Sequence, residues 1–169
     1  SEASVEVDVA ERGHFTFEGA TNISVSDNFA MRVAGYHSTE DGYVNNAFDG
    51  QDYLGHEKTA FRVSGLYGTD VMEVLFTAEY EDMDRDGSAY RVDLRSPRLE
   101  TYEAALGEVN MPPDARSINS DMFGGSADDA KITTLGLHID YDFENMTLSW
   151  STGYKDHDYL YSEDYDGTP

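Results

Sequence analysis

A strict alternation of apolar and polar residues runs through most of this sequence and constrains the fold more than any other feature. Between residues 72 and 80 the even positions are apolar, as Phe76 is, while positions between them include the polar Thr77 and Glu79. Successive side chains of a β-strand point to opposite faces, so the pattern predicts a strand with one apolar and one polar face. The same alternation predicts strands at 5–9, 15–25, 29–36, 61–67, 72–80, 135–143 and 146–155.

The connections between these segments alternate in length. Short polar links at 26–28, 68–70 and 144–145 are typical of hairpin turns. Long polar stretches run from about His37 to Lys58 and from about Asp82 to Thr133. A compact soluble domain rarely contains so long a loop as the second, whereas outer-membrane barrels combine short turns on one side with long loops on the other. We therefore expect an all-β fold, an antiparallel up-and-down meander of about seven strands that is part of a transmembrane β-barrel.

Charge and composition exclude several classes of protein. The 34 acidic and 11 basic residues give a formal net charge of -23, which repels nucleic-acid phosphates, so we expect no nucleic-acid partner. The sequence has no cysteine, which excludes disulfide scaffolds, zinc-thiolate sites and cysteine nucleophiles.

Tyr36, Tyr80 and Tyr154 lie near the outer ends of predicted strands, where an aromatic girdle would meet lipid headgroups.

Two consecutive predicted strands and the segments after them carry a succession of motifs. Residues 22–36 read N-I-S-V-S-D-N-F-A-M-R-V-A-G-Y, in which a strand ends in a Ser-Asp turn and the next has an apolar-Arg-apolar-Ala-Gly-Tyr pattern. Asp-Gly-Tyr follows at 41–43, and an acidic run follows at 82–90. This succession resembles the barrel of TonB-dependent outer-membrane receptors, in which such an acidic loop often comes two strands later. The resemblance rests on the ordered succession of these motifs along most of the chain.

Membership of this family would imply a 22-stranded barrel filled by an N-terminal plug domain, with energy delivered by the TonB complex. We recognise neither a plug nor a TonB-contact segment. We therefore expect residues 1–169 to be a partial β-barrel domain, truncated at both ends, whose missing parts contact TonB. The resemblance also implies the outer membrane of a Gram-negative bacterium, with membrane lipid as a partner. It further implies capture of a siderophore, cobalamin or oligosaccharide by the external loops, from about His37 to Lys58 and from about Asp82 to Thr133.

An acidic motif in the second long loop is the candidate metal site. Asp82, Asp84 and Asp86, followed by Gly87, match the start of a D-x-D-x-D-G calcium loop. Calcium prefers several hard oxygen ligands, which alternate residues of a tight loop can supply. The twelfth position of the motif holds Asp93 instead of glutamate, so we do not expect an EF-hand. Calcium is the one cofactor that the sequence brings into consideration.

We recognise no catalytic arrangement and expect no enzymatic activity. The five histidines show neither i, i+4 pairs nor the HExxH pattern of zinc enzymes, and there is no G-x-S-x-G nucleophile motif. Arg32 and Arg62 lie on the polar faces of their strands, where we expect them to pair with Glu18, Glu73 or Glu79. Residues 102–106 are compatible with a short helix.

Two functions remain open at this point. The first is part of a TonB-dependent active-transport receptor, and the second is a soluble, secreted β-sandwich binding module with a calcium-dependent ligand site. Acidity and alternation fit both, while the unequal connections favour the barrel. The apolar face of the sheet distinguishes them, because a second sheet covers that face in a sandwich and lipid covers it in a barrel.

Overall fold

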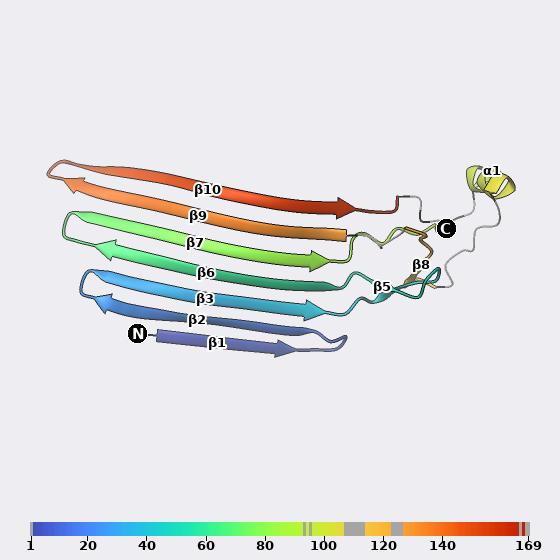
Figure 1. Cartoon of the computed structure of the whole chain (residues 1–169), viewed down its shortest axis with the longest axis horizontal. Helices are drawn as coiled ribbons and strands as arrows, with labels where there is room; N and C mark the ends of the chain where they lie inside the picture. Colours follow the sequence, from blue (N-terminus) through green and yellow to red (C-terminus); the bar gives the residue numbers. More distant parts are fainter. Residues whose placement is uncertain are drawn as a thin grey trace. The chain divides into compact units, whose positions relative to one another are not determined.

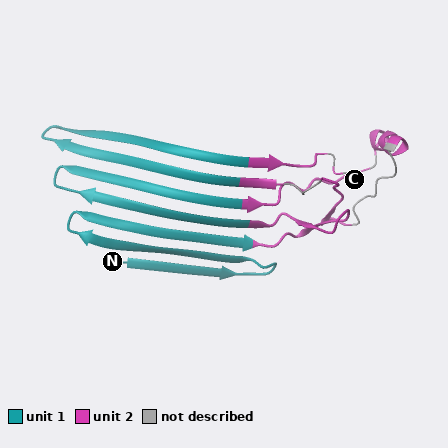
Figure 2. Cartoon of the chain, in the orientation of Figure 1, with its two compact units in different colours: residues 1–39, 57–83, 130–159 teal, residues 40–56, 84–129, 160–169 magenta. Residues whose placement is uncertain are grey.

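The structure, a computed structural model, describes residues 2–92, 94, 96–106, 114–122, 127–165 and 167. The chain divides into two compact units (Figure 2). Unit 1 consists of residues 1–39, 57–83 and 130–159, and unit 2 consists of residues 40–56, 84–129 and 160–169. Several long strands contain residues of both units.

Seven strands form one antiparallel sheet with the order β1-β2-β3-β6-β7-β9-β10 (Figure 1). They are β1 (Glu2–Val9), β2 (Phe15–Ser26), β3 (Phe29–Glu40), β6 (His56–Gly68), β7 (Met72–Arg85), β9 (Ala127–Phe143) and β10 (Met146–Ser162). Each strand lies beside the strand of this sheet that precedes it in the chain, and β1 and β10 are the two edges. The predicted all-β meander is confirmed.

The register of the strands assigns each side chain to one face of the sheet, because direct cross-strand partners point the same way. Phe17 of β2 lies opposite Val7 of β1 and opposite His37 of β3. A Cβ atom at Gly35 would lie 3.6 Å from the ring of Phe61, which extends the same face to β6. We call this side the apolar face, as its members are almost all hydrophobic, and the opposite side the polar face.

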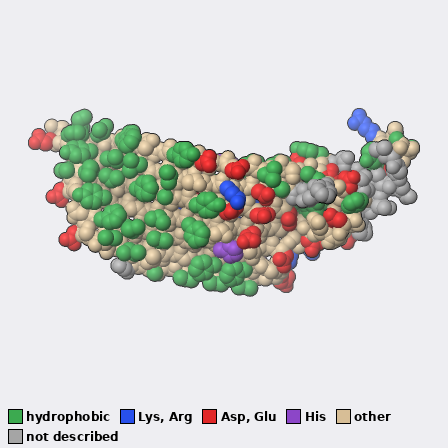
Figure 3. Space-filling model, in the orientation of Figure 1, with side chains coloured by type: hydrophobic (Ala, Val, Ile, Leu, Met, Phe, Trp, Pro, Cys, Tyr) green, Lys and Arg blue, Asp and Glu red, His purple; other side chains and the backbone are tan. Residues whose placement is uncertain are grey.

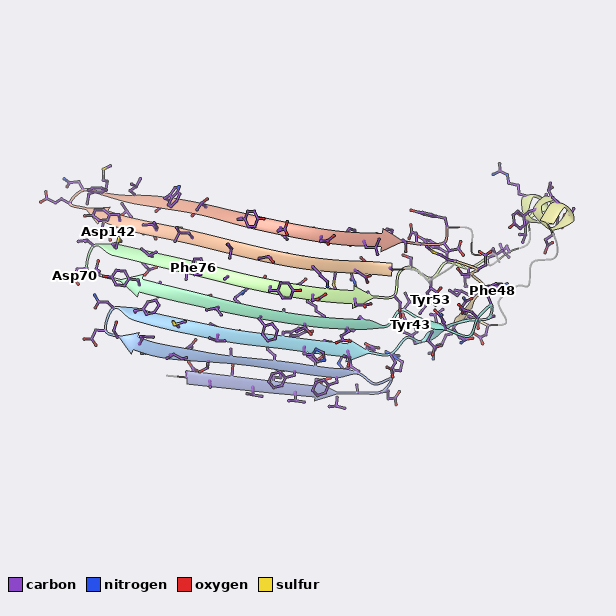
Figure 4. All side chains as sticks on the ribbon, in the orientation of Figure 1. Tyr43, Phe48, Tyr53, Asp70, Phe76 and Asp142 are labelled. Carbon is purple, nitrogen blue, oxygen red and sulfur yellow. The ribbon has the colours of Figure 1, made fainter. Side chains whose placement is uncertain are left out.

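The apolar face of unit 1 is uncovered over its whole width (Figure 3). Phe76, which projects from the middle of β7 (Figure 4), is 45% exposed. Other exposed hydrophobic residues on this face are Val5, Val7, Phe15, Phe17, Phe61, Val63, Tyr80, Leu135, Leu148, Trp150 and Tyr154. Soluble monomers rarely expose so continuous an apolar surface, so this face requires an apolar environment from outside the described chain.

Three short turns join neighbouring strands at one end of the sheet. In the turn between β6 and β7, the Thr69 amide donates to the Met72 carbonyl over 2.8 Å. The Gly68 amide donates to the Asn28 carbonyl of the neighbouring turn over 2.9 Å. Asp70 and Asp142 lie at this end, where they meet solvent beyond the apolar side chains (Figure 4). Tight polar turns of this kind hold the register of the meander.

The strands are longer than the alternation predicted. β3 continues four residues beyond the expected end, to Glu40, and β7 continues from residue 80 to Arg85. β9 begins at Ala127, where a loop was predicted, and β10 continues to Ser162. The predictions stopped where side chains became polar on both faces. Backbone pairing, as in the partners Asp82 and Lys131, continues through these residues because the ladder needs no apolar side chains.

Unit 2 contains a second, smaller sheet with the order β5-β4-β8, built from β4 (Val44–Asn46), β5 (Asp52–Tyr53) and β8 (Ser117–Ile118). β4 pairs antiparallel with β5 and parallel with β8. Val44, Tyr53 and Ile118 are buried together and form the hydrophobic core of this unit. The two long connections therefore contain folded segments within the residues that the structure describes.

Helix α1 (Pro97–Leu106) also lies in unit 2 and begins earlier than the segment 102–106 that the sequence indicated. Pro97 occupies its first turn, where a missing amide is harmless. Ser96 caps it, since the Leu99 amide donates to the Ser96 hydroxyl over 3.3 Å. Among the residues that the structure describes, no helix is long and apolar enough to cross a membrane.

The close packing at Gly55 yields a first prediction. A Cβ atom there would approach the Gly42 amide nitrogen at 2.8 Å and the Asp86 carboxylate at 2.9 Å, which is closer than real Cβ contacts. Gly55→Ala should therefore destabilise unit 2 by about 1–3 kcal/mol, the usual cost of overpacking. Limited proteolysis should show faster cleavage within residues 41–55.

Gly68→Ala is the matched control, because a Cβ atom at Gly68 meets nothing within 4 Å and the backbone there needs no left-handed conformation. Equal cleavage of both variants would contradict the packing described around Gly55.

Candidate functional site

The apolar face of unit 1 is bounded by polar groups along β7. The apolar side chains run from Met72 to Tyr80, within the roughly 9–11 residues of a membrane-crossing strand. The Tyr80 hydroxyl donates to the Asp82 carboxylate over 3.2 Å, and the Lys131 ammonium lies 3.6 Å from the same carboxylate. Tyr80 thus presents its ring to the apolar side and its hydroxyl to the charged side, as tyrosines do at a membrane interface.

Aromatic residues also border the apolar face at the end with the short turns. The rings of Tyr141 and Phe143 lie 4.7 Å apart at a tilt of 57°. Tyr67 ends the apolar side of β6, one residue before the strand itself ends. The face therefore has amphipathic or aromatic residues at both ends of the strands.

The girdle prediction for Tyr36 is wrong. Tyr36 lies opposite Glu18 in the register, and both share the polar face with Arg32. Tyr80 and Tyr154 do lie on the apolar face. Phe29 and Val33 of the same strand belong to the apolar face. Tyr36 is an odd number of residues away from both, and side chains alternate between the two faces along a strand. The side chain of Tyr36 therefore points to the polar face.

The polar face of unit 1 carries ion pairs and hydrogen bonds between neighbouring strands. Arg62 forms a salt bridge with Glu79, as the sequence predicted. The Lys58 ammonium lies 3.0 Å from the Glu81 carboxylate, so a second pair continues along β6 and β7. Arg32 donates to the Asn22 side chain over 2.9 Å instead of contacting one of the expected glutamates.

A shallow groove on this face is lined by Glu18, Tyr36, Lys58, Arg62, Glu79 and Glu81. On β9 and β10, His138 is hydrogen-bonded to Ser151 over 2.7 Å and to Asp140 over 3.0 Å. These side chains are partly exposed, so water can solvate them. Charged groups arranged in this way suit a wet surface, in contrast to the apolar face behind them.

Asn46 ties together two segments of unit 2 that are far apart in the chain. Its side chain is completely buried. The amide nitrogen donates to the Ser120 carbonyl over 2.8 Å, and the amide oxygen accepts from the Ser120 amide over 3.0 Å. The same oxygen accepts from the Phe48 amide over 3.3 Å. One side chain therefore satisfies polar backbone groups of both long connections, which holds them in one arrangement.

The turn that follows β4 presents an exposed aromatic ring. Phe48 is 56% exposed, although its backbone is held by Asn46 (Figure 4). The Gln51 amide donates to the Asp49 carboxylate over 3.0 Å, and Gly50 adopts a φ of 79° that favours glycine. A rigid turn with a solvent-facing phenylalanine is suited to contact a ligand, because little conformational freedom is lost on binding.

A carboxylate surrounded by tyrosines lies at the end of β10. Glu163 accepts hydrogen bonds from the hydroxyls of Tyr161 and Tyr165. The Ser88 hydroxyl lies 3.1 Å from that of Tyr161. The rings of Tyr90 and Tyr165 stack with their centroids 5.6 Å apart. Residues that follow β7 and residues at and beyond the end of β10 thus share one polar and aromatic cluster.

Hydrogen bonds within this cluster shift the pKa values of its members. Hydrogen bonds from Tyr161 and then Tyr165 lower the pKa of Glu163. The hydrogen bond to Glu163, followed by the charge of that carboxylate, raises the pKa of Tyr165 to about 12. The hydrogen bond that Tyr161 itself donates to Glu163 raises the pKa of Tyr161. Glu163 therefore stays ionised and the two phenols stay protonated at neutral pH.

The three aspartates proposed for calcium lie on extended backbone. Asp82 and Asp84 belong to β7, and Asp86 forms a single β-bridge with Ala127. The Asp86 carboxylate accepts from the Gly55 amide over 2.8 Å, and Asp82 has the partners given above. Alternate residues of a strand are spread about 6–7 Å apart.

Within the described part of the chain, the structure brings together no group of three histidine, aspartate or glutamate side chains that could hold a metal ion. Asp93, the twelfth residue of the calcium motif, lies outside the described residues.

No protein-family model matches this sequence, and neither a curated protein nor a solved structure shows detectable similarity to it. The two unlike faces of the sheet and the folded connections of unit 2 are therefore the features from which function can be inferred.

Removing the Asn46 side chain should loosen unit 2. Asn46→Ala leaves the buried amide and carbonyl of Ser120 without partners, at a cost of about 1–3 kcal/mol. Hydrogen–deuterium exchange should become faster in residues 114–122 as well as in residues 41–55. Asn45→Ala is the control, because the Asn45 side chain is exposed and its amide group donates to Gly50 and Asp52, which lie nearby in the chain. Unchanged exchange in residues 114–122 would refute the role of Asn46.

The tyrosine cluster should respond to alkaline pH. Because the pKa of Tyr165 is raised from 10.0 to about 12, its hydrogen bond to Glu163 favours folding fully below pH 10.0. That contribution disappears as the pH rises to about 12. Ultraviolet difference titration of the chain against Tyr165→Phe should show the phenolate of Tyr165 forming near pH 12. In Glu163→Gln, that titration should move toward pH 10.0, and an unchanged midpoint would exclude the carboxylate as the cause.

Proposed function

We propose that residues 1–169 form part of the wall of an outer-membrane β-barrel, in a receptor of the TonB-dependent type that takes up a scarce nutrient. One observation carries this proposal. A seven-stranded meander exposes a continuous apolar face, while its other face bears the ion pairs of Arg62 and Lys58. Lipid outside and water inside are the environments that satisfy these two faces together.

The backbone of the sheet supports this membrane assignment. Between its edges each strand pairs with a neighbour on both sides, so interior amide and carbonyl groups do not depend on water. The apolar stretch of β7 has the length of a crossing strand, and Tyr80 is placed as an interfacial residue. The β-sandwich alternative lacks comparable support, since the side chains that a second sheet would bury are exposed.

Unit 2 supports the receptor part of the proposal. Its segments connect the strand ends opposite the short turns, and they are folded around Val44, Tyr53 and Ile118. They present exposed aromatic rings, among them Phe48 and Tyr165. Connections of this kind on a rigid scaffold are where binding residues concentrate. The resemblance of residues 22–36 to TonB-dependent receptors supplies the transport function, with a siderophore, cobalamin or oligosaccharide as ligand.

A charge on the apolar face should disrupt the protein far more than the same charge on the polar face. Phe76→Arg places a cation near the middle of the lipid-facing stretch, at a cost of about 2–4 kcal/mol. Thr77→Arg is the matched control, because Thr77 is next to Phe76 in β7 and its side chain points to the polar face. Both variants are made in the full native protein and probed in fractionated cells by gels of heated and unheated samples.

The parent protein should give an outer-membrane band whose mobility changes on heating, as folded barrels do. Phe76→Arg should reduce that band, and Thr77→Arg should retain it. Equal bands from the two variants would contradict the assignment of the faces. A soluble native species no larger than this chain would contradict the membrane proposal itself.

A further inference from the structure

The rings of Tyr90 and Tyr165 form a flat aromatic surface in unit 2, which we call the tyrosine platform. Their centroids lie 5.6 Å apart and their planes are inclined by only 24°, so the two rings stack. Tyr165 is 77% exposed and Tyr90 is 41% exposed. The stack therefore covers one side of the Tyr165 ring and leaves most of that residue open to solvent.

Hydrogen bonds and close packing hold the tyrosine platform in place. The Glu163 carboxylate accepts hydrogen bonds from the hydroxyls of both Tyr165 and Tyr90. Gly167 is buried, and a Cβ atom there would lie 3.1 Å from the Tyr90 carbonyl oxygen. The two rings are thus anchored at their hydroxyl ends, and the chain segments that carry them pack closely together. A ligand that stacks on this surface loses little of its binding free energy to ordering the protein.

An open hollow of about 250 Å³ lies next to the platform, within the same unit. Ser88 lines the hollow, and its hydroxyl lies 3.1 Å from that of Tyr161 in the tyrosine cluster. The Arg85 guanidinium and the Asp128 carboxylate, which lie 2.6 Å apart, also line it, as does Asp86. The hollow therefore offers hydrogen-bond donors and acceptors beside an aromatic surface, which is the usual composition of a small-molecule site.

The charge and shape of this region limit the ligands that it can bind. Unit 2 contains 17 acidic and five basic residues, so its surface repels anions such as negatively charged ferric chelates. An organic cation suits the charge, but sites for such cations surround the ion with aromatic rings. The nearly parallel rings of Tyr90 and Tyr165 instead present one flat surface. An uncharged ligand with a flat apolar face and polar edges fits both conditions.

We propose that the tyrosine platform and the adjacent hollow bind a neutral oligosaccharide, with one sugar ring stacked on Tyr165. This inference rests on the proposed function, because it selects one of the three ligand classes named there. The C–H face of a sugar ring is apolar and weakly positive, which complements the negative face of an aromatic ring. Sugar hydroxyls both donate and accept hydrogen bonds, so they match the carboxylates, the guanidinium and the Ser88 hydroxyl of the hollow.

Glycan-array binding by the full native protein in detergent tests this inference. The array carries neutral hexose and pentose oligosaccharides together with sialylated and sulfated ones. The parent protein should bind at least one neutral glycan in preference to the anionic glycans. For that glycan in solution, Tyr165→Ala should raise the Kd about tenfold, as truncation of a central aromatic residue does in other binding sites. Tyr165→Phe keeps the ring and should keep most of the affinity.

Tyr154→Ala is the matched control, because Tyr154 is also an exposed tyrosine of this chain but lies on the apolar face of unit 1. Its Kd for the glycan should equal that of the parent. Failure of the parent to bind any neutral glycan would overturn the inference, and so would equal Kd values for Tyr165→Ala and the parent. Binding of choline or ferric citrate that depends on Tyr165, without glycan binding, would assign the platform to a cation or an anion instead.

Gels of heated and unheated samples keep this test separate from that of the proposed function. A heat-modifiable outer-membrane band without glycan binding would refute the sugar site alone. A soluble native species that binds a neutral glycan through Tyr165 would refute the barrel and support the sugar site.

Discussion

The backbone hydrogen-bond ladder of the seven-stranded sheet is the interaction on which the rest of the structure depends. It pairs the amide and carbonyl groups of the interior strands with one another, so the sheet can exist as a single layer. Because the backbone needs no water, the side chains of one face can be apolar from β1 to β10. The ion pairs on the opposite face, such as Arg62 with Glu79, are then free to meet water.

Among the described residues, the buried hydrophobic cluster belongs to unit 2 and not to the large sheet of unit 1. Val44, Tyr53 and Ile118 form the core of unit 2, which also holds its long connections through the buried Asn46. The sheet of unit 1 instead offers its hydrophobic surface outward. Its free energy of folding therefore depends on what covers that surface, and a bilayer is the cover that our proposed function supplies. The two units thus illustrate two different sources of stability within one chain.

The sequence predictions succeeded where apolar and polar side chains alternate along a strand. They were wrong at positions where this alternation is absent or does not decide the face. All seven long strands were located, and the pairing of Arg62 with Glu79 was expected. The ends of β7 and β9 were misplaced, because ladder pairing continues where both faces are polar. Tyr36 was assigned to the aromatic girdle from its position near a strand end, although its place in the pleat turns it to the polar face. The buried Asn46 was missed altogether, since a loop asparagine gives no signal of its partner 74 residues away.

The sequence by itself determined the strands, their two unlike faces and the short turns, because each depends on residues close together in the chain. The tertiary structure decided the residue-by-residue register between neighbouring strands, the full lengths of β7 and β9, and the folding of the long connections around Asn46. It also decided that Asp82 and Asp84 lie on β7. These features depend on backbone pairing between distant segments, and such pairing leaves little trace in the local pattern of side chains.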